Sequence, residues 1–197
     1  MYKYSMNNNC WYSLNIDFSN ALRKDWVWKI PDLKKTSVQC VNTQMFNSDW
    51  LNYMKSIGVP IDQVMLFYRI PKFYSRIAHV DVKTNNDNTS LSYVPYAINW
   101  VIEGQDSEMK WYNLPEEHQN VKYTMANTPY LDWPIYKLNE IDTINSQNSF
   151  TLVRTDIPHR VQMNEKPRWS ISTRSSSFDT WDHAVNHFRS KNLLIER

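Results

Sequence analysis

The stretch from Phe150 to Arg174, FTLVRTDIPHRVQMNEKPRWSISTR, carries the strongest structural signals in the chain. It reads as two β-strands joined by a polar loop, because an apolar run opens it and a polar–apolar alternation closes it. In the closing strand Arg168 and Ser170 are two residues apart, so their side chains face the same way. A guanidinium beside a hydroxyl suits a carboxylate ligand. His159 lies nine positions before Arg168 and is a candidate metal ligand, which predicts further ligands upstream in the chain.

A second histidine lies upstream in the segment RIAHVDVK, residues 76–83. His79 and Asp81 are again two residues apart in a strand-like alternation, so both side chains point to one face. Together with His159 they make a set of two histidines and one carboxylate. Such a set with open positions is typical of non-haem Fe(II) oxygenases. The competing interpretation is a surface pair in which a histidine contacts a neighbouring acid.

The composition is that of an ordinary globular protein. The chain has 197 residues, of which 42% are hydrophobic and 21% are charged, and the formal net charge is +2. So small a charge gives no argument for binding nucleic acid or a membrane surface. No apolar run approaches the length of a membrane span, and the N-terminus lacks a secretory pattern, which predicts an intracellular, cytoplasmic protein. Cys10 and Cys40 form no disulfide framework and no metal-binding spacing.

The pattern of strands predicts an all-β fold. About eight strand candidates lie between Val64 and Ser175, with turn residues at short intervals, which favours a sandwich or barrel. We expect a single domain with a core at about 64–175, an N-terminal extension at 1–62 and a C-terminal helix at 179–190. Another helix is expected from Asn47 or Ser48 to Gly58. Residues 127–134 read as an irregular connection with two prolines, and residues 135–141 as an alternating segment.

The spacing of these motifs resembles that of the 2-oxoglutarate- and Fe(II)-dependent oxygenase superfamily. The shared features are the His-x-Asp unit at His79, the distal His159 and the Arg-x-Ser unit at Arg168, over about 64–175. The segments YAINWVIEG, MKWYNLP and RTDIPHRVQ look similar to those of small viral or bacterial members, so a virus-encoded origin fits the resemblance. The resemblance implies a double-stranded β-helix, also called a jelly-roll or cupin-like core, with a few flanking helices.

The resemblance also implies roles for individual residues. His79, Asp81 and His159 would hold Fe(II), while Arg168 and Ser170 would bind the distal carboxylate of 2-oxoglutarate. Strand order suggests that Tyr68 and Asn99 line the same cavity and contact this cosubstrate. Three further arginines compete for related roles: Arg174 and Arg160 as alternative carboxylate clamps, and Arg154 on the substrate side.

The expected activity is oxidative decarboxylation of 2-oxoglutarate to succinate and CO2, coupled to hydroxylation. We expect the substrate to be a small molecule or a peptide, and an amino acid or a side chain of a peptide or protein is the first choice. Two alternatives remain open: a cupin-type metalloenzyme that needs no 2-oxoglutarate, and a non-enzymatic jelly-roll module with a structural or ligand-binding role. The first would not require Arg168, and the second would not require Asp81.

Two other groups of residues have competing interpretations. His183 and His187 are four residues apart on the expected C-terminal helix, a spacing that can bind metal. No glutamate follows His183, so a solvated helix face is the simpler interpretation. A set of aromatic residues could line a substrate pocket, although such residues more often belong to the core. These are Trp100, Trp111, Tyr112 and Trp133.

Overall fold

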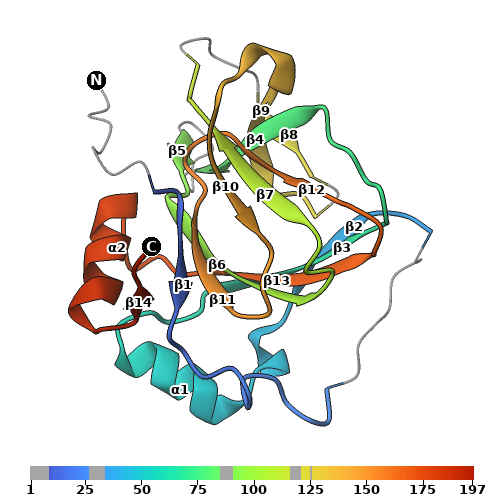
Figure 1. Ribbon diagram of the computed structural model, residues 1–197. Helices are drawn as coiled ribbons and strands as arrows, with labels where there is room; N and C mark the ends of the chain where they lie inside the picture. The colour runs from blue at the N-terminus through green and yellow to red at the C-terminus, as the bar shows by residue number, and fades with distance from the viewer. Residues whose placement is uncertain (1–8, 27–33, 85–90, 116–120, 125) are drawn as a thin grey trace.

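The computed structural model describes residues 9–26, 34–84, 91–115, 121–124 and 126–197, which form two antiparallel β-sheets and two α-helices (Figure 1). The all-β core expected from the sequence is therefore confirmed. The first sheet has the order β14 (Leu194–Ile195), β1 (Trp11–Leu14), β11 (Phe150–Arg154), β6 (Tyr96–Glu103), β13 (Arg168–Arg174), β3 (Gln63–Arg69) and β2 (Ser37–Val41). The second has the order β10 (Glu140–Asn145), β7 (Glu108–Tyr112), β12 (His159–Gln162), β4 (Ile77–Thr84), β9 (Pro129–Pro134) and β8 (Lys122–Tyr123), and β5 (Leu91–Tyr93) pairs with β4.

Both α-helices cover the outer face of the first sheet (Figure 1). Helix α1 (Ser48–Ser56) is capped by Asn47, whose side chain accepts a hydrogen bond from a backbone N–H of the first turn. Helix α2 (Trp181–Ser190) is capped in the same way by Thr180. The apolar sides of the two helices and the outer residues of the sheet form one hydrophobic cluster, so the expected positions of both helices are confirmed.

The sheets use more of the chain than the core expected at 64–175. Strands β1 and β14 extend one edge of the first sheet, and β2 extends the other. Strand β1 pairs in register with β11, so the N-terminal segment and residues 150–154 pack as one unit. Two short 3-10 helices, η1 (Thr43–Met45) and η2 (Ile135–Lys137), lie in the connections.

The expected boundaries are wrong in three places. The stretch from Phe150 to Arg174 contains three strands, because the four residues of β12 pair with β7 and the first of them, His159, also pairs with β4. Residues 129–134 form strand β9 rather than an irregular connection. Their two prolines stand at its first and last positions, where a missing N–H is best tolerated. The alternation at 135–141 belongs to η2 and the start of β10, since so short a pattern does not separate a turn from a strand.

The inner face of β13 is polar, which is unusual for a strand covered on both sides. Arg168, Ser170, Ser172 and Arg174 all line a cavity between the sheets, while Ile171, on the opposite face, joins the core under the helices. The polar face of β13 therefore points to the interior between the sheets and not to solvent. Its apolar face packs under the helix layer, and its polar face lines an internal site.

Gly104 packs closely against the backbone at the start of β13. Its φ is +87°, and a Cβ atom there would lie 2.5 Å from the carbonyl oxygen of Pro167 and 2.7 Å from the Cα of Arg168. We expect Gly104→Ala to lower the free energy of unfolding by about 3 kcal/mol or more, because backbone strain adds to a backbone clash. Chemical denaturation measures this loss. Gly58 also has a positive φ of +83°, but a Cβ there meets only the ring of His187, at 3.1 Å. Gly58→Ala is the milder control, and equal losses in both variants would contradict the prediction.

Candidate metal centre

His79, Asp81 and His159 converge in the structure as the sequence predicted. His79 and Asp81 lie on β4, and His159 opens β12, where it is the direct cross-strand partner of His79. The two imidazole rings have centroids 4.4 Å apart. One potential ligand atom from each of the three residues can be chosen so that all lie within 4.8 Å of one another. Cross-strand pairing brings two residues 80 positions apart in the chain into one site.

The protonation of the group suits a divalent cation. Burial and the neighbouring His159 lower the pKa of His79 to about 3, and burial likewise lowers the pKa of His159. Both imidazoles are therefore neutral near pH 7, as metal ligands must be. The Nδ1 of His159 lies 3.0 Å from the carbonyl oxygen of Ile157, to which it donates. This hydrogen bond leaves the Nε2 lone pair of His159 for a metal.

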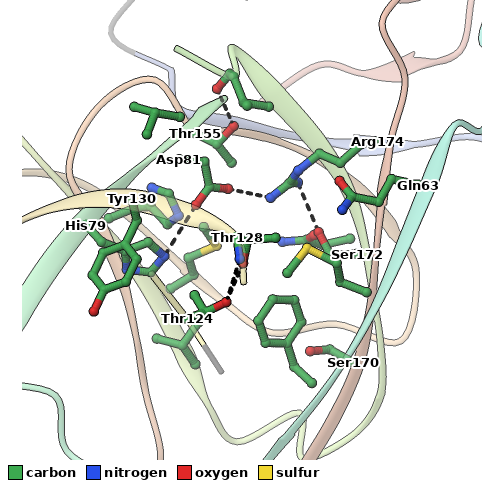
Figure 2. A pocket seen from close by; sticks show the side chains of 18 of the residues that line it. Gln63, His79, Asp81, Thr124, Thr128, Tyr130, Thr155, Ser170, Ser172 and Arg174 are labelled. Atoms are coloured by element: carbon green, nitrogen blue, oxygen red, sulfur yellow. Dashed lines mark hydrogen bonds and ion pairs between the residues drawn. The ribbon is translucent and has the colours of Figure 1, made fainter. Parts of the chain in front are cut away.

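Asp81 faces both histidines and an arginine. Burial alone would raise the pKa of Asp81, but Arg174 and the two histidines outweigh it and hold the pKa below its usual value. One carboxylate oxygen pairs with the guanidinium of Arg174, and the other lies 3.6 Å from Nε2 of His79, too far for a hydrogen bond. Figure 2 shows Asp81 between these two partners. Arg174 thus neutralises one oxygen and leaves the other directed at the histidines.

A cavity of about 110 Å³ extends from this group between the two sheets. Arg168 and Ser170 line it, as predicted, and Nη1 of Arg168 donates to the hydroxyl of Ser170 at 2.9 Å. The Nε of Arg168 is buried without a hydrogen-bond acceptor among the described residues, and Oδ1 of Asn99 is buried without a donor among them. Burial, with repulsion from Arg69, holds the pKa of Arg168 well below its usual range. The cavity therefore contains an unsatisfied donor on Arg168 and an unsatisfied acceptor on Asn99.

The predicted contact of Tyr68 with the cavity is wrong. On β3 the residues Met65, Phe67 and Arg69 face the cavity, so Tyr68 faces the opposite side. There it packs against Trp169 of β13, with ring centroids 4.7 Å apart. Asn99, placed by the same reasoning on β6, does line the cavity.

Arg69 is the cavity residue that the sequence reasoning missed. It is the cross-strand partner of Arg168, and both side chains point into the cavity. The sequence contains a pattern that could have identified Arg69, since this residue ends a mostly apolar strand and shares the face of Phe67. The choice between Tyr68 and Arg69 depends on which face of β3 turns inward, and this is decided by the packing of the helices.

The other arginines have structural partners. Arg160 donates to the hydroxyl of Tyr112, the carbonyl oxygen of Ser75 and the side chain of Gln162. Arg154 pairs with Asp156 at 2.6 Å. Arg174 pairs with Asp81 and with Ser172. Neither Arg160 nor Arg168 has a carboxylate partner among the described residues, but of these two only Arg168 has a buried guanidinium nitrogen without an acceptor there.

The remaining candidates belong to the scaffold. His183 and His187 contact the ring of Phe178, and Nε2 of His187 donates to the carbonyl of Ile57 at 2.6 Å. Neither belongs to a metal-ligand group within the described part of the chain. The four candidate pocket aromatics are buried in the core, as their alternative interpretation predicted. They are Trp100, Trp111, Tyr112 and Trp133.

Comparison of the chain with models of known protein families gives no match, and comparison with curated protein sequences gives none either. Within the described residues, no helix has the length and apolar character required to cross a bilayer. The geometry of the site is therefore the basis on which a function can be assigned. That geometry is a His-Asp-His group able to hold a metal ion, next to a basic cavity.

Proposed function

We propose that this protein is an Fe(II)- and 2-oxoglutarate-dependent oxygenase that hydroxylates an amino acid or a side chain of a peptide or protein. The observation that carries the proposal is the position of Arg168 and Ser170 in the same cavity as the three candidate metal ligands. A metal site alone fits many proteins. A metal site with an unpaired, buried guanidinium on the adjacent wall fits a cosubstrate that is chelated at one end and carries a carboxylate at the other.

The strand order supports the double-stranded β-helix that the proposal requires. Strands β11, β6, β13 and β3 are neighbours in the first sheet, and β10, β7, β12 and β4 are neighbours in the second. Along the chain, β3, β6, β11 and β13 of the first sheet are interleaved with β4, β7 and β12 of the second, as in a jelly-roll, while β8, β9 and β10 follow β7 within the second sheet. In this arrangement the ligands on β4 and β12 and the arginine on β13 face one interior.

The roles of the residues follow from their positions. His79, His159 and Asp81 would hold the ion through two neutral imidazoles and one carboxylate, a set that leaves positions open to further ligands. Bound there with 2-oxoglutarate, Fe(II) would supply the oxygen chemistry that forms succinate, CO2 and a hydroxylated product. Arg168 would anchor the distal carboxylate, and Ser170 would hold the guanidinium in place. Arg174 orients the carboxylate of Asp81, and the side chains of His79 and Asp81, which are 31% and 20% exposed, remain accessible to an incoming ligand.

The direct test is to add Fe(II) and 2-oxoglutarate to the protein without oxygen. A chelated 2-oxo acid on Fe(II) is expected to give a weak visible absorption band, and admitting air is expected to produce succinate slowly even without substrate. Absence of both the band and the succinate would end the proposal. Bound metal without the band, together with turnover that survives Arg168→Ala, would favour a cupin-type metalloenzyme that needs no 2-oxoglutarate. No bound metal at all would favour a structural or binding module.

A further inference from the structure

A second hollow of about 230 Å³ opens beside the candidate metal centre. It shares His79, Phe67 and Arg69 with the cavity described above, so the two spaces adjoin at a metal ligand. Its other walls come from β2, the β3–β4 connection, β9 and β12. Most of the lining is apolar or aromatic, from Val38, Phe67, Phe73, Ile77, Tyr130 and Val161. A space of this kind next to a metal is where a substrate with an apolar part would lie.

Arg69 is the unpaired charge in this hollow. It stands directly across from Arg168 in the antiparallel pair of β3 and β13. Like charges in directly opposed positions destabilise a sheet, and burial increases the effect. Arg69 forms no ion pair with any carboxylate in the described parts of the chain. Its observed contact is with the ring of Phe67, whose centroid lies 5.0 Å from the guanidinium carbon.

The second arginine of the hollow is already engaged. Arg160 is buried, its guanidinium makes three hydrogen bonds to protein groups, and it stacks over the ring of Tyr74. It contributes positive potential to the hollow but has little capacity for a new partner. Arg69 is therefore the residue that would bind an anion directly.

The charges of the site also call for an anionic substrate. Among the described residues, the first cavity contains three guanidinium groups and one carboxylate, an excess of two positive charges. The two charges of an Fe(II) ion and the two of a 2-oxoglutarate dianion cancel, so loading the site leaves the excess unchanged. The second hollow is lined by no acidic residue among those described. An uncompensated positive excess in a partly enclosed space between two sheets favours the entry of an anion.

We propose that the second hollow binds a substrate with a carboxylate or phosphate group held by Arg69, and an apolar part of about the size of one ring. That the bound anion is a substrate rests on the proposed oxygenase function, whereas the anion site itself does not. In the loaded protein Arg168 would hold the cosubstrate and Arg69 the substrate, so the two opposed arginines would each have a partner.

Benzoate and benzamide are the probes that test the site, because they share a ring and differ in charge. Calorimetric titration is done on the metal-free protein and on the protein loaded anaerobically with Fe(II) and 2-oxoglutarate. We expect benzoate to bind at least about tenfold more tightly than benzamide, since a charge-assisted hydrogen bond contributes about 1.5–3 kcal/mol. Phenyl phosphate against phenol, titrated in parallel, shows whether the site prefers phosphate to carboxylate.

The variant Arg69→Gln is expected to abolish the preference for the acid. Arg76→Gln is the matched control, because Arg76 is an exposed arginine just before β4 and lines neither cavity. Equal binding of acid and amide by the wild type, or a preference that survives Arg69→Gln, would overturn the inference. The inference would also be overturned if Arg69→Gln lost the 2-oxoglutarate band and nothing else, since Arg69 would then belong to the cosubstrate clamp. A missing band in the wild type refutes the oxygenase proposal but leaves the benzoate result to decide on Arg69.

Discussion

Replacing Asp81 with alanine is expected to lower the affinity for Fe(II) by more than about 100-fold, because changes that only reorient a metal ligand already cost about 10–100-fold. The variant removes the single carboxylate of the candidate centre. It also leaves Arg174 without its counter-charge, at a cost on the order of 3 kcal/mol in the free energy of unfolding. Metal analysis after equilibrium dialysis and a denaturation curve measure the two effects separately.

Asp142 offers a matched control for this variant. Its carboxylate is also largely buried and paired with an arginine, at 2.8 Å from Arg197, but it lies on β10 and lines neither cavity. Asp142→Ala should therefore lose stability and keep the metal. Retention of one equivalent of Fe(II) by Asp81→Ala at wild-type affinity would show that the His-Asp-His group is not a metal site.

Replacing Arg168 with methionine is expected to weaken 2-oxoglutarate binding by about 100-fold, because two charge-assisted hydrogen bonds to the distal carboxylate are lost. Methionine keeps an unbranched stem of similar shape. Fe(II) affinity should not change, since Arg168 does not contact the three candidate ligands. Titration of the anaerobic visible band with 2-oxoglutarate measures the effect.

The same variant distinguishes a ligand-binding role from a structural one. In the ligand-free protein the charge of Arg168 is buried opposite Arg69 and without a carboxylate partner among the described residues. Removing it should leave the melting temperature of the ligand-free protein unchanged or raise it. A marked loss of stability together with unchanged 2-oxoglutarate affinity would assign Arg168 to the scaffold. Arg174→Gln provides the contrast, because it should weaken metal binding more than cosubstrate binding.

Much of the site could be read from local spacing. A strand places residues i and i+2 on one face whatever surrounds it, so the pairs His79 with Asp81 and Arg168 with Ser170 follow from the sequence. The helix caps at Asn47 and Thr180 follow from side chains that bind the backbone within a few residues. Strand β9 was missed because prolines usually mark loops, and their tolerance at strand ends depends on a neighbouring strand.

The sequence by itself therefore determined which residues share a face and where the candidate ligands lie along the chain. Only the tertiary structure decided which face turns inward. The strand R-W-S-I-S-T-R would place its polar side in water if the other side packed into an ordinary core. Here the helices bury the apolar side, and the polar side closes a cavity with the second sheet. The same packing turned Tyr68 away and Arg69 inward, since the direction of a strand's faces is set by contacts distant in the chain.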